Sequence, residues 1–384
     1  MTRRLDVATS RLAALVPGAP VDLVLDLGSA HPSSHPGMRL TLELDGDVIV
    51  SARAHVGLMH RGAEKLFEVR DYRQALVLAN RHDWLSAFSN ELGIVLLLER
   101  MLGMELPPRA VWVRTLLAEV NRALSHLAFL GTFPVSAPSA TVRGIGGREA
   151  LQQVLEEISG GRVHAMLNQV GGLRAEIPEG WTGRVRTAAG VAREAVTELS
   201  ADLLGSPAFV SATQGVAVID TGLVEPYGLS GPVARASGVD LDLRRDAPYL
   251  AYAELTDVLR IPTRAIGDAL ARMTLLVEET EVALDLVDAA ADRLDSAAAG
   301  PVSVRLPKAL RVPEGEAYAW TEGPLGASGY YVVSRGDRTP WRLKMRTPSF
   351  AHVQVLEAVL PGTRLEHLVA TLASLSFVVG DVDR

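Results

Sequence analysis

Residues 55–91 read HVGLMHRGAEKLFEVRDYRQALVLANRHDWLSAFSNE, and the polar groups around which the chain is organised are concentrated there. Arg81, Asp83 and Glu91 lie in a run whose pattern is otherwise that of an amphipathic helix, and charged side chains are buried only with partners. The helical pattern comes from apolar residues at steps of three and four from Asp71 onward, namely Leu76, Ala79, Leu85, Phe88, Leu92 and Val95. The stretch therefore predicts a core helical segment with charged groups that serve structure or function.

The composition predicts a large globular chain. With 384 residues, 48% of them apolar, the chain can bury a sizeable core and is expected to form one large domain or two tightly packed ones. The apolar run VLLLERML is interrupted at Glu99, and no run reaches the roughly 18 to 20 residues that span a bilayer. Any membrane role is expected to be peripheral. The first twenty residues lack the apolar core and cleavage site of a signal peptide, which favours the cytoplasm.

Charge and cysteine content exclude several classes of function. The net charge of −7, without a basic stripe, argues against nucleic acid as a partner, because phosphate binding requires clustered lysine and arginine. The chain has no cysteine, so it forms no disulfide and cannot hold an iron–sulfur cluster or a nickel–iron centre through thiolates.

The N-terminal part is predicted to be a small antiparallel sheet. Residues 21–27 and 40–50 alternate between apolar and polar, and Asp45-Gly46 marks a hairpin turn. Pro32 and Pro36 prevent a helix between these strands. His31 and His35 are four residues apart, but without a helix this spacing does not bring them together on a metal, and no metal site is expected.

The central part is predicted to be an antiparallel helical bundle. Gly103 suits the end of one helix, and Pro107-Pro108 suits the start of the next. Residues 131–147, GTFPVSAPSATVRGIGG, are predicted to form a loop beside a cavity. The GIGG segment lacks the preceding strand and the spacing of a nucleotide-binding loop. Helices are expected over residues 109–130, 148–158, 183–204 and 263–296.

Two features of the remaining chain complete the pattern. Glu119 and Arg122 form an i,i+3 pair that is either exposed to solvent or buried inside the bundle, and both alternatives point to a structural role. The segments EAYAWTE, GYYVVSRG and WRLKMRTP read as strands, followed by a last helix that ends near Ser374. No internal repeat or flexible linker is evident.

The motifs together resemble one known family. HVGLMHRGAEKL followed by SAFSNE resembles the 49 kDa subunit of respiratory complex I, and the similarity continues through LGSAHPSSHPGMRLTLELDG, LLAEVNRALSHLAFLGTF, LKMRTPSF and VVGDVDR. That family is itself similar to the large subunit of nickel–iron hydrogenases with the metal-binding cysteines lost. The resemblance implies an α+β fold in which an antiparallel helical bundle core carries a small N-terminal antiparallel sheet and a C-terminal β region, without a metal site.

The chain is expected to divide into three regions that form one structural unit. Residues 1–67 would hold the N-terminal α+β region with the quinone-loop hairpin. Residues 68–300 would form the helical bundle, and residues 301–384 a β/α region packed on it.

The resemblance implies a subunit of a proton-translocating NADH-quinone oxidoreductase, active only within the complex. The chain would form the quinone-reduction site with a neighbouring subunit that carries an iron–sulfur cluster, and would pass electrons to quinone. The sequence does not say which quinone is used, although almost all of its basic residues are arginine, a bias of high-GC bacteria that often use menaquinone. The chain itself would bind no cofactor, and NAD and FMN would lie elsewhere in the complex. Its partners would be the cluster-bearing subunit, adjoining peripheral-arm subunits and the quinone-channel membrane subunit, at the cytoplasmic face of the membrane.

The resemblance also implies roles for individual residues. His35 matches the histidine that hydrogen-bonds the quinone headgroup, and the alternative is a solvated histidine in a turn. Arg61 and His164 match an arginine and a histidine beside the terminal cluster. For Arg61 the alternative is a salt bridge with Glu64 or Glu68.

Four positions depart from the family pattern. Trp84 stands where the family has a tyrosine that joins the histidine on the quinone headgroup, and an indole donates a hydrogen bond but offers no acid–base chemistry. Ser136 stands in place of the carboxylate that orients that histidine. Gln169 replaces an arginine, and Ser376 replaces an aspartate.

Three hypotheses remain open from the sequence. In the first, the chain is the quinone-site subunit of a divergent complex I, with His35, Trp84 and Ser136 at the quinone. His35 remains there, and water or Trp84 replaces the partners that it has lost. Alternatively, it is a non-catalytic structural or assembly paralogue with a degenerate site. A third hypothesis is that the same subunit serves a complex fed by another donor, such as reduced deazaflavin or ferredoxin.

Overall fold

The computed structural model describes residues 3–8, 23–26, 37–133 and 138–384. The predicted site residues His35 and Ser136 lie outside these ranges. The strands are β1 (Arg3–Ala8), β2 (Leu23–Asp26), β3 (Arg39–Asp45), β4 (Val48–His55), β5 (Asn168–Gln169), β6 (Gly172–Leu173), β7 (Gly315–Gly323), β8 (Gly326–Ser334) and β9 (Arg342–Arg346).

The longer described helices are α4 (Ala87–Met101), α5 (Pro108–Gly131), α6 (Pro138–Ser159), α7 (Trp181–Leu204) and α12 (Ala269–Ser296). Shorter helices are α2 (Ala63–Glu68), α3 (Tyr72–Asn80), α8 (Pro207–Thr213), α9 (Thr221–Tyr227), α10 (Gly231–Ala236), α11 (Leu243–Asp246), α13 (Pro348–Gln354), α14 (Leu356–Val359), α15 (Leu368–Ser374) and α16 (Val379–Val382). Two 3-10 turns cover Tyr252–Glu254 and Leu365–His367. The mixture of helices and separate sheets confirms the α+β class.

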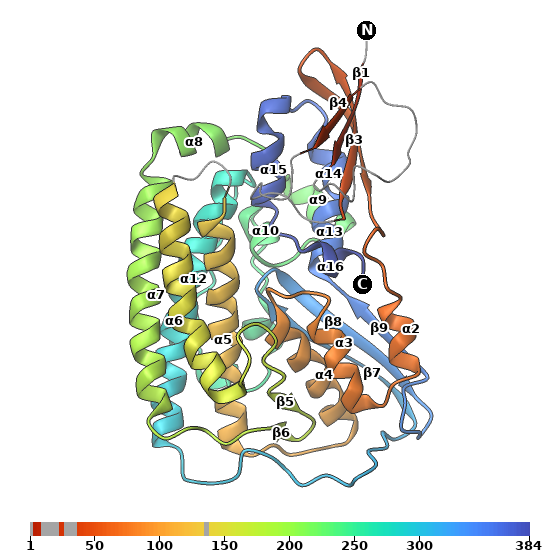
Figure 1. Ribbon diagram of the computed structural model, residues 1–384, viewed down its shortest axis with the longest axis vertical. Coiled ribbons are helices and arrows are strands. Elements are labelled where there is room, and N and C mark those ends of the chain that lie inside the picture. Colours follow the sequence, from red (N-terminus) through yellow and green to blue (C-terminus); the bar gives the residue numbers. More distant parts are fainter. Residues whose placement is uncertain (1–2, 9–22, 27–36, 134–137) are drawn as a thin grey trace.

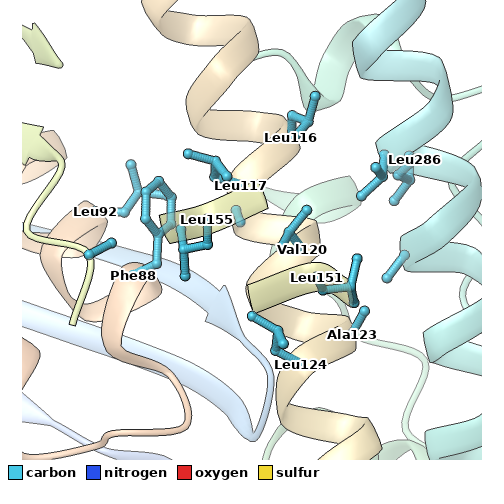
Figure 2. Close-up of a cluster of buried hydrophobic side chains, with 14 of the residues drawn as sticks. Phe88, Leu92, Leu116, Leu117, Val120, Ala123, Leu124, Leu151, Leu155 and Leu286 are labelled. Carbon is cyan, nitrogen blue, oxygen red and sulfur yellow. The ribbon is translucent and has the colours of Figure 1, made fainter. Parts of the chain in front are cut away.

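The helical bundle occupies one side of the molecule (Figure 1). Helices α5 and α7 run in one direction and α6 and α12 in the other, and α5 packs on both α6 and α12. Apolar side chains fill the space between α4, α5, α6 and α12 (Figure 2). This confirms the predicted antiparallel bundle. Figure 2 labels Phe88, Leu92, Leu116, Leu117, Val120, Ala123, Leu124, Leu151, Leu155 and Leu286.

The prediction of a loop over residues 131–147 is wrong beyond its first residues, because α6 begins at Pro138. The glycines there serve helix packing instead. A Cβ on Gly144 would lie 2.8 Å from the Gly131 Cα of α5, and a Cβ on Gly147 would lie 2.8 Å from the Ala195 Cβ of α7. Close packing between helices therefore outweighs the poor intrinsic helix propensity of glycine.

The stretch that follows Asp71 is two helices rather than one. Asp71 caps α3, since its carboxylate accepts from the amides of Arg73 and Gln74, both at 3.0 Å. The chain then leaves the helix over residues 81–86 and re-enters it in α4. The Asp83 carboxylate makes this break by accepting the amides of Leu85 and Ser86 at 3.0 and 3.1 Å, a bonding pattern that competes with continued helix.

The N-terminal sheet has the strand order β2-β1-β3-β4. The β3–β4 hairpin turns at Gly46, whose φ of 64° suits glycine, as the Asp45-Gly46 signal predicted. One pairing differs from the prediction: β2 pairs parallel to β1, whereas the sequence pattern suggested a purely antiparallel sheet. Strand β1 lies between β2 and β3, and the local hairpin pattern gave no sign of a strand at that place in the sheet.

The C-terminal region confirms the predicted strands. Strands β7, β8 and β9 form an antiparallel sheet in that order and pack against α4. The contact is very close, because a Cβ on Gly93 of α4 would lie 2.6 Å from the Tyr330 Cε2 of β8. The helices that follow pack with the N-terminal sheet in a second apolar cluster. No helix in the described part of the chain is long and apolar enough to cross a bilayer.

Buried charges link the bundle to the C-terminal sheet. Glu119 and Arg122 of α5 are buried, with Arg122 Nε 3.1 Å from the Glu119 carboxylate, so of the two alternatives the buried pair is correct. Arg122 also donates to the carbonyls of Glu322 and Gly323 at 2.7 and 3.1 Å. The Arg244 guanidinium is a second cation on this carboxylate, 3.0 Å from Glu119. The charged residues on α5 therefore fix the sheet to the bundle.

A second buried cation, Arg235 of α10, ties three further elements together. Its guanidinium lies 2.9 Å from Glu279 of α12, 2.8 Å from Glu322 of β7 and 3.3 Å from Asp242. The pKa of Glu279 falls to about 2: burial would raise it, but the nearby guanidinium and His126 outweigh burial. Such a network is strongly destabilised when one partner is removed.

Candidate functional site

Glu91 of α4 positions the segment that carries His164. Its buried carboxylate accepts from the Met166 amide at 2.9 Å and from the backbone and side chain of Asn168 at 3.3 and 3.4 Å. The Asn80 side-chain amide donates to it as well. Burial raises the Glu91 pKa to about 7, although these donors favour the charged form. The carboxylate thus holds residues 164–168 against α3 and α4.

Replacing Glu91 by glutamine is expected to release this segment. Every described partner of the carboxylate is a hydrogen-bond donor, so the new amide N–H group would face donors and lose about 1 to 3 kcal/mol. Amide hydrogen exchange of residues 163–170 should rise by about tenfold. Glu194→Gln, an exposed change on α7, serves as the control, and unchanged protection in Glu91→Gln would refute the positioning role.

An ion pair holds the next turn of the same segment. Arg114 of α5 forms a two-pronged contact with Glu99 of α4 at 2.8 and 2.9 Å. The same guanidinium donates to the carbonyls of Gln169 and Gly172, each at 2.8 Å. Strands β5 and β6 are therefore fixed from the bundle side. The Gln169 side chain is used locally, donating to the Leu173 carbonyl at 3.0 Å.

Trp84 lies in the break between α3 and α4, and its side chain is half-buried. Its ring packs against Gly380 of α16: a Cβ on Gly380 would lie 2.7 Å from Trp84 Cζ3 and would also meet the His82 carbonyl oxygen. The absence of a side chain at position 380 therefore permits the ring to lie against the C-terminal segment. The sequence pattern alone did not show this contact.

A buried polar group lies behind this tryptophan. His82 Nδ1 is 2.9 Å from the Asp381 carboxylate, and His82 Nε2 is 3.2 Å from the Tyr330 hydroxyl. Tyr330 in turn donates to Asn90 at 3.3 Å. We call His82, Asp83, Tyr330 and Asp381 the His82 cluster, and all four side chains are buried.

The C-terminal residues also hold the HVGLMHRG segment. The Asp383 carboxylate accepts from the amides of Gly57 and Met59 at 2.6 and 2.7 Å, and His60 Nδ1 lies 2.8 Å from the Asp383 carbonyl oxygen. The same short segment therefore contacts both polar stretches that the sequence singled out, through Asp381 and Asp383.

Positive groups gather on one exposed face beside α3. Arg61 donates to the Arg81 carbonyl at 3.4 Å, and the Arg81 side chain approaches Met166 Sδ at 3.5 Å. His164 is half-buried, and burial followed by the charge of Arg81 lowers its pKa. Arg61 and His164, far apart in the sequence, thus both lie next to Arg81.

The comparisons with known proteins agree with one another. The family model for the 49 kDa subunit of respiratory-chain NADH dehydrogenase matches residues 135–310 and 302–384. One D-type subunit of the NADH-quinone oxidoreductase of Streptomyces coelicolor is 57% identical over 94% of this chain and 95% of its own length. A counterpart from Streptomyces griseus is 55% identical over 94% and 93%, and one from Solibacter usitatus is 35% identical over 94% of each chain.

The chain belongs to the 49 kDa subunit family. This confirms the resemblance inferred from the motifs. Relatives in this family are named as subunits of NADH-quinone oxidoreductase, so the 49 kDa subunit is part of an oxidoreductase complex.

The structure tests the alternative role of Arg61, a salt bridge with Glu64 or Glu68. The described ion pairs of Glu64 and Glu68 go to Lys65, Arg342 and Arg384, and none of them joins either carboxylate to Arg61. The roles of Arg61 and His164 beside a cluster, and of His35 at a quinone, stay predictions for this 49 kDa subunit.

The departures from the family pattern lie in two places. Trp84 and Ser376 both lie near α16, and Ser376 is buried with a positive φ of 47°. Gln169 lies in the hairpin that follows His164. Ser136 lies outside the described residues. Among the described residues, no three or more histidine, aspartate or glutamate side chains are arranged to hold a metal ion.

The groups that hold the site together were not evident from the sequence. Glu91 was recognised only as a charge in need of a partner, and its position within an apolar helical stripe was the available signal. The contact of His82 with Asp381 had no such signal, because the two residues lie far apart in the sequence of this 49 kDa family member, in its first third and near its last residues.

Proposed function

We propose that this chain forms the quinone-reduction site of an NADH-quinone oxidoreductase together with a cluster-bearing neighbour. The observation that carries the proposal is the adjacency of two features. The cationic face made by Arg61 and Arg81, next to His164, continues directly into the loop that carries Trp84, because Arg81 is the first residue of that loop.

Electrostatics support a partner cluster on this face. A cluster that accepts an electron gains negative charge, and exposed guanidinium groups nearby stabilise the reduced form. Neither Arg61 nor Arg81 has a carboxylate among its described hydrogen-bond partners, so their charges act outward. Because Arg61 and Arg81 lie at the α3–α4 loop, a partner's iron–sulfur cluster bound beside them would be close to the quinone.

The proposal extends to the whole assembly. The chain would bind no cofactor itself: the partner subunit would hold the iron–sulfur cluster, and NAD and FMN would bind elsewhere. It would contact adjoining peripheral-arm subunits and a quinone-channel membrane subunit at the cytoplasmic face, with reduction coupled to proton translocation. The helical bundle would correspond to that of a nickel–iron hydrogenase large subunit without its metal.

A non-catalytic paralogue is the second candidate. The loss of a phenol at Trp84 favours it, since an indole cannot donate a proton under physiological conditions. In that case Trp84 would fill the headgroup position, and membranes containing the complex would show no quinone reduction that depends on this chain with any donor.

Replacing Trp84 by tyrosine tests the proposal. In membranes from a deletion strain complemented with each variant, Trp84→Tyr should still support quinone reduction and should change the quinone KM by more than about threefold, since the aromatic surface and its polar atom contact the ring. The matched control is Trp341→Tyr, on an exposed tryptophan stacked with Arg335. Identical kinetics for wild type and Trp84→Tyr would remove this position from the site. Absence of chain-dependent quinone reduction in the wild type would support the paralogue.

A further inference from the structure

The His82 cluster contains two buried carboxyl groups, of which Asp381 contacts the imidazole and Asp83 is near enough to both to interact with their charges. Asp381 contacts His82 Nδ1 at 2.9 Å and also accepts the Ser349 amide at 3.1 Å. Asp83 directly follows His82, and its carboxylate is buried on the same loop. Tyr330 closes the group on the other imidazole nitrogen at 3.2 Å. Asp381 alone would suffice to pair with His82, and Asp83 is held beside it by the Leu85 and Ser86 amides.

The surrounding elements add few other charges. Strand β8 contributes Tyr330, α16 contributes Asp381, and α4 contributes the neutral Asn90. Arg346 of β9 and His352 of α13 are near enough to Asp381 to interact with its charge. These are the titratable and charged groups of the described elements packed around the imidazole.

We propose that the His82 cluster stores an exchangeable proton one residue from Trp84 and delivers it to the quinone site, where the phenol of a tyrosine is missing. The inference rests on the proposed function. Reduction of a quinone to a quinol consumes two electrons, supplied by the partner's iron–sulfur cluster, and two protons. In this scheme one of the two protons passes from the Asp83 carboxyl group to a quinone oxygen, the second comes from solvent water, and solvent water then reprotonates Asp83. His82 is a positioning residue here, because it acts through the two carboxyl groups.

The electrostatics of the two acids agree with this assignment. Burial, together with the charge of Asp381, raises the pKa of Asp83 to about 7. For Asp381, burial acts in the same direction, but His82 and the Ser349 donors outweigh it, so that its pKa is lowered. Of the two acids, Asp83 therefore carries the proton at lower pH, and it loses this proton as the pH rises through about 7.

The first test uses His82→Gln in the assembled complex. Without the imidazole, the repulsion between the two carboxylates is offset less well, so their last proton is held more tightly. Quinone turnover should fall about three- to tenfold, the quinone KM should change less than about twofold, and the alkaline limb of the pH profile should move up by about one unit. His367→Gln, on a more exposed histidine, is the control. A uniform loss of activity with an unshifted profile would indicate a purely structural role and overturn the inference.

A second variant guards against failure of assembly. Tyr330→Phe removes one hydroxyl and keeps the ring that packs against Gly93, so folding should be preserved while His82 loses a partner. The pH profile of this variant should shift less than that of His82→Gln, although measurably. Wild-type behaviour in a well-assembled Tyr330→Phe complex, together with an unshifted His82→Gln profile, would also count against the cluster.

A spectroscopic measurement separates this inference from the proposed function. Infrared spectra of the complex labelled with 13C-aspartate should show the carbonyl band of a protonated carboxylic acid that titrates near pH 7, disappears in Asp83→Asn and moves to higher pH in His82→Gln. The band does not depend on turnover. If it titrates as expected while the wild type reduces no quinone, the proposed function is wrong and proton storage stands. If quinone is reduced and the band is absent, proton storage is wrong.

Discussion

His35→Ala is expected to lower quinone-dependent turnover at least about tenfold while the complex still assembles. The family resemblance puts this histidine at the quinone headgroup, and a hydrogen bond from a group that can carry charge is worth roughly 1.5 to 3 kcal/mol. Imidazole suits the position because it can donate a hydrogen bond or a proton near neutral pH. The effect should appear in the turnover of membranes or purified complex with saturating quinone.

The same loop supplies the control for this experiment. His31→Ala removes a histidine four residues earlier without touching the predicted headgroup contact, so it should leave turnover within about twofold. If His35→Ala and His31→Ala are equally active in assembled complexes, the quinone role of His35 fails and the structural paralogue gains support.

Arg235→Met is expected to destabilise the chain by about 3 to 5 kcal/mol. The change keeps most of the side-chain volume but leaves Glu279, Glu322 and Asp242 without the cation they surround. For a chain of this length, that loss corresponds to a decrease of roughly 4 to 6 °C in the melting temperature. The measurement is thermal unfolding of the purified full-length chain, together with its recovery in the assembled complex.

A surface arginine provides the comparison. Arg193 pairs with Asp285 and Asp288 on the outside of the bundle at 2.8 and 2.9 Å, and its side chain is 37% exposed. Arg193→Met should therefore lose less than about 1 kcal/mol. The deficit of Arg235→Met should also shrink between pH 7 and pH 5, since protonation relieves the stranded carboxylates. Equal stability of the two variants would show that the buried network contributes little.

The sequence predicted those parts of the fold that depend on local pattern. Regular apolar spacing located α5, α7 and α12, and Asp45-Gly46 located the hairpin between β3 and β4. The glycines of residues 138–147 led to the wrong prediction of a loop where α6 begins. The free energy gained by close packing against α5 and α7 cannot be read from the segment itself. The parallel partner of β1 was likewise hidden, since it depends on chain topology.

The candidate site was predictable to a smaller extent. Family motifs identified Arg61, Trp84 and His164 as candidates, and the structure brings Arg61 and His164 together around Arg81. The contact of His82 with Asp381 joins the first third of the chain to its final residues. Such a contact forms only when the whole fold is present, so no spacing rule could have indicated it.

The close contact between Gly93 and Tyr330 limits how this subunit can adapt to heat. Replacing a glycine inside a helix by alanine is a common route to higher thermal stability, worth up to about 1 kcal/mol from helix propensity. At position 93 the new methyl group would meet the Tyr330 ring at 2.6 Å and displace the hydroxyl that reaches His82. Thermophilic relatives that keep this tyrosine would therefore have to gain stability elsewhere, and position 93 should resist laboratory selection for thermostability as long as quinone-linked growth is also demanded.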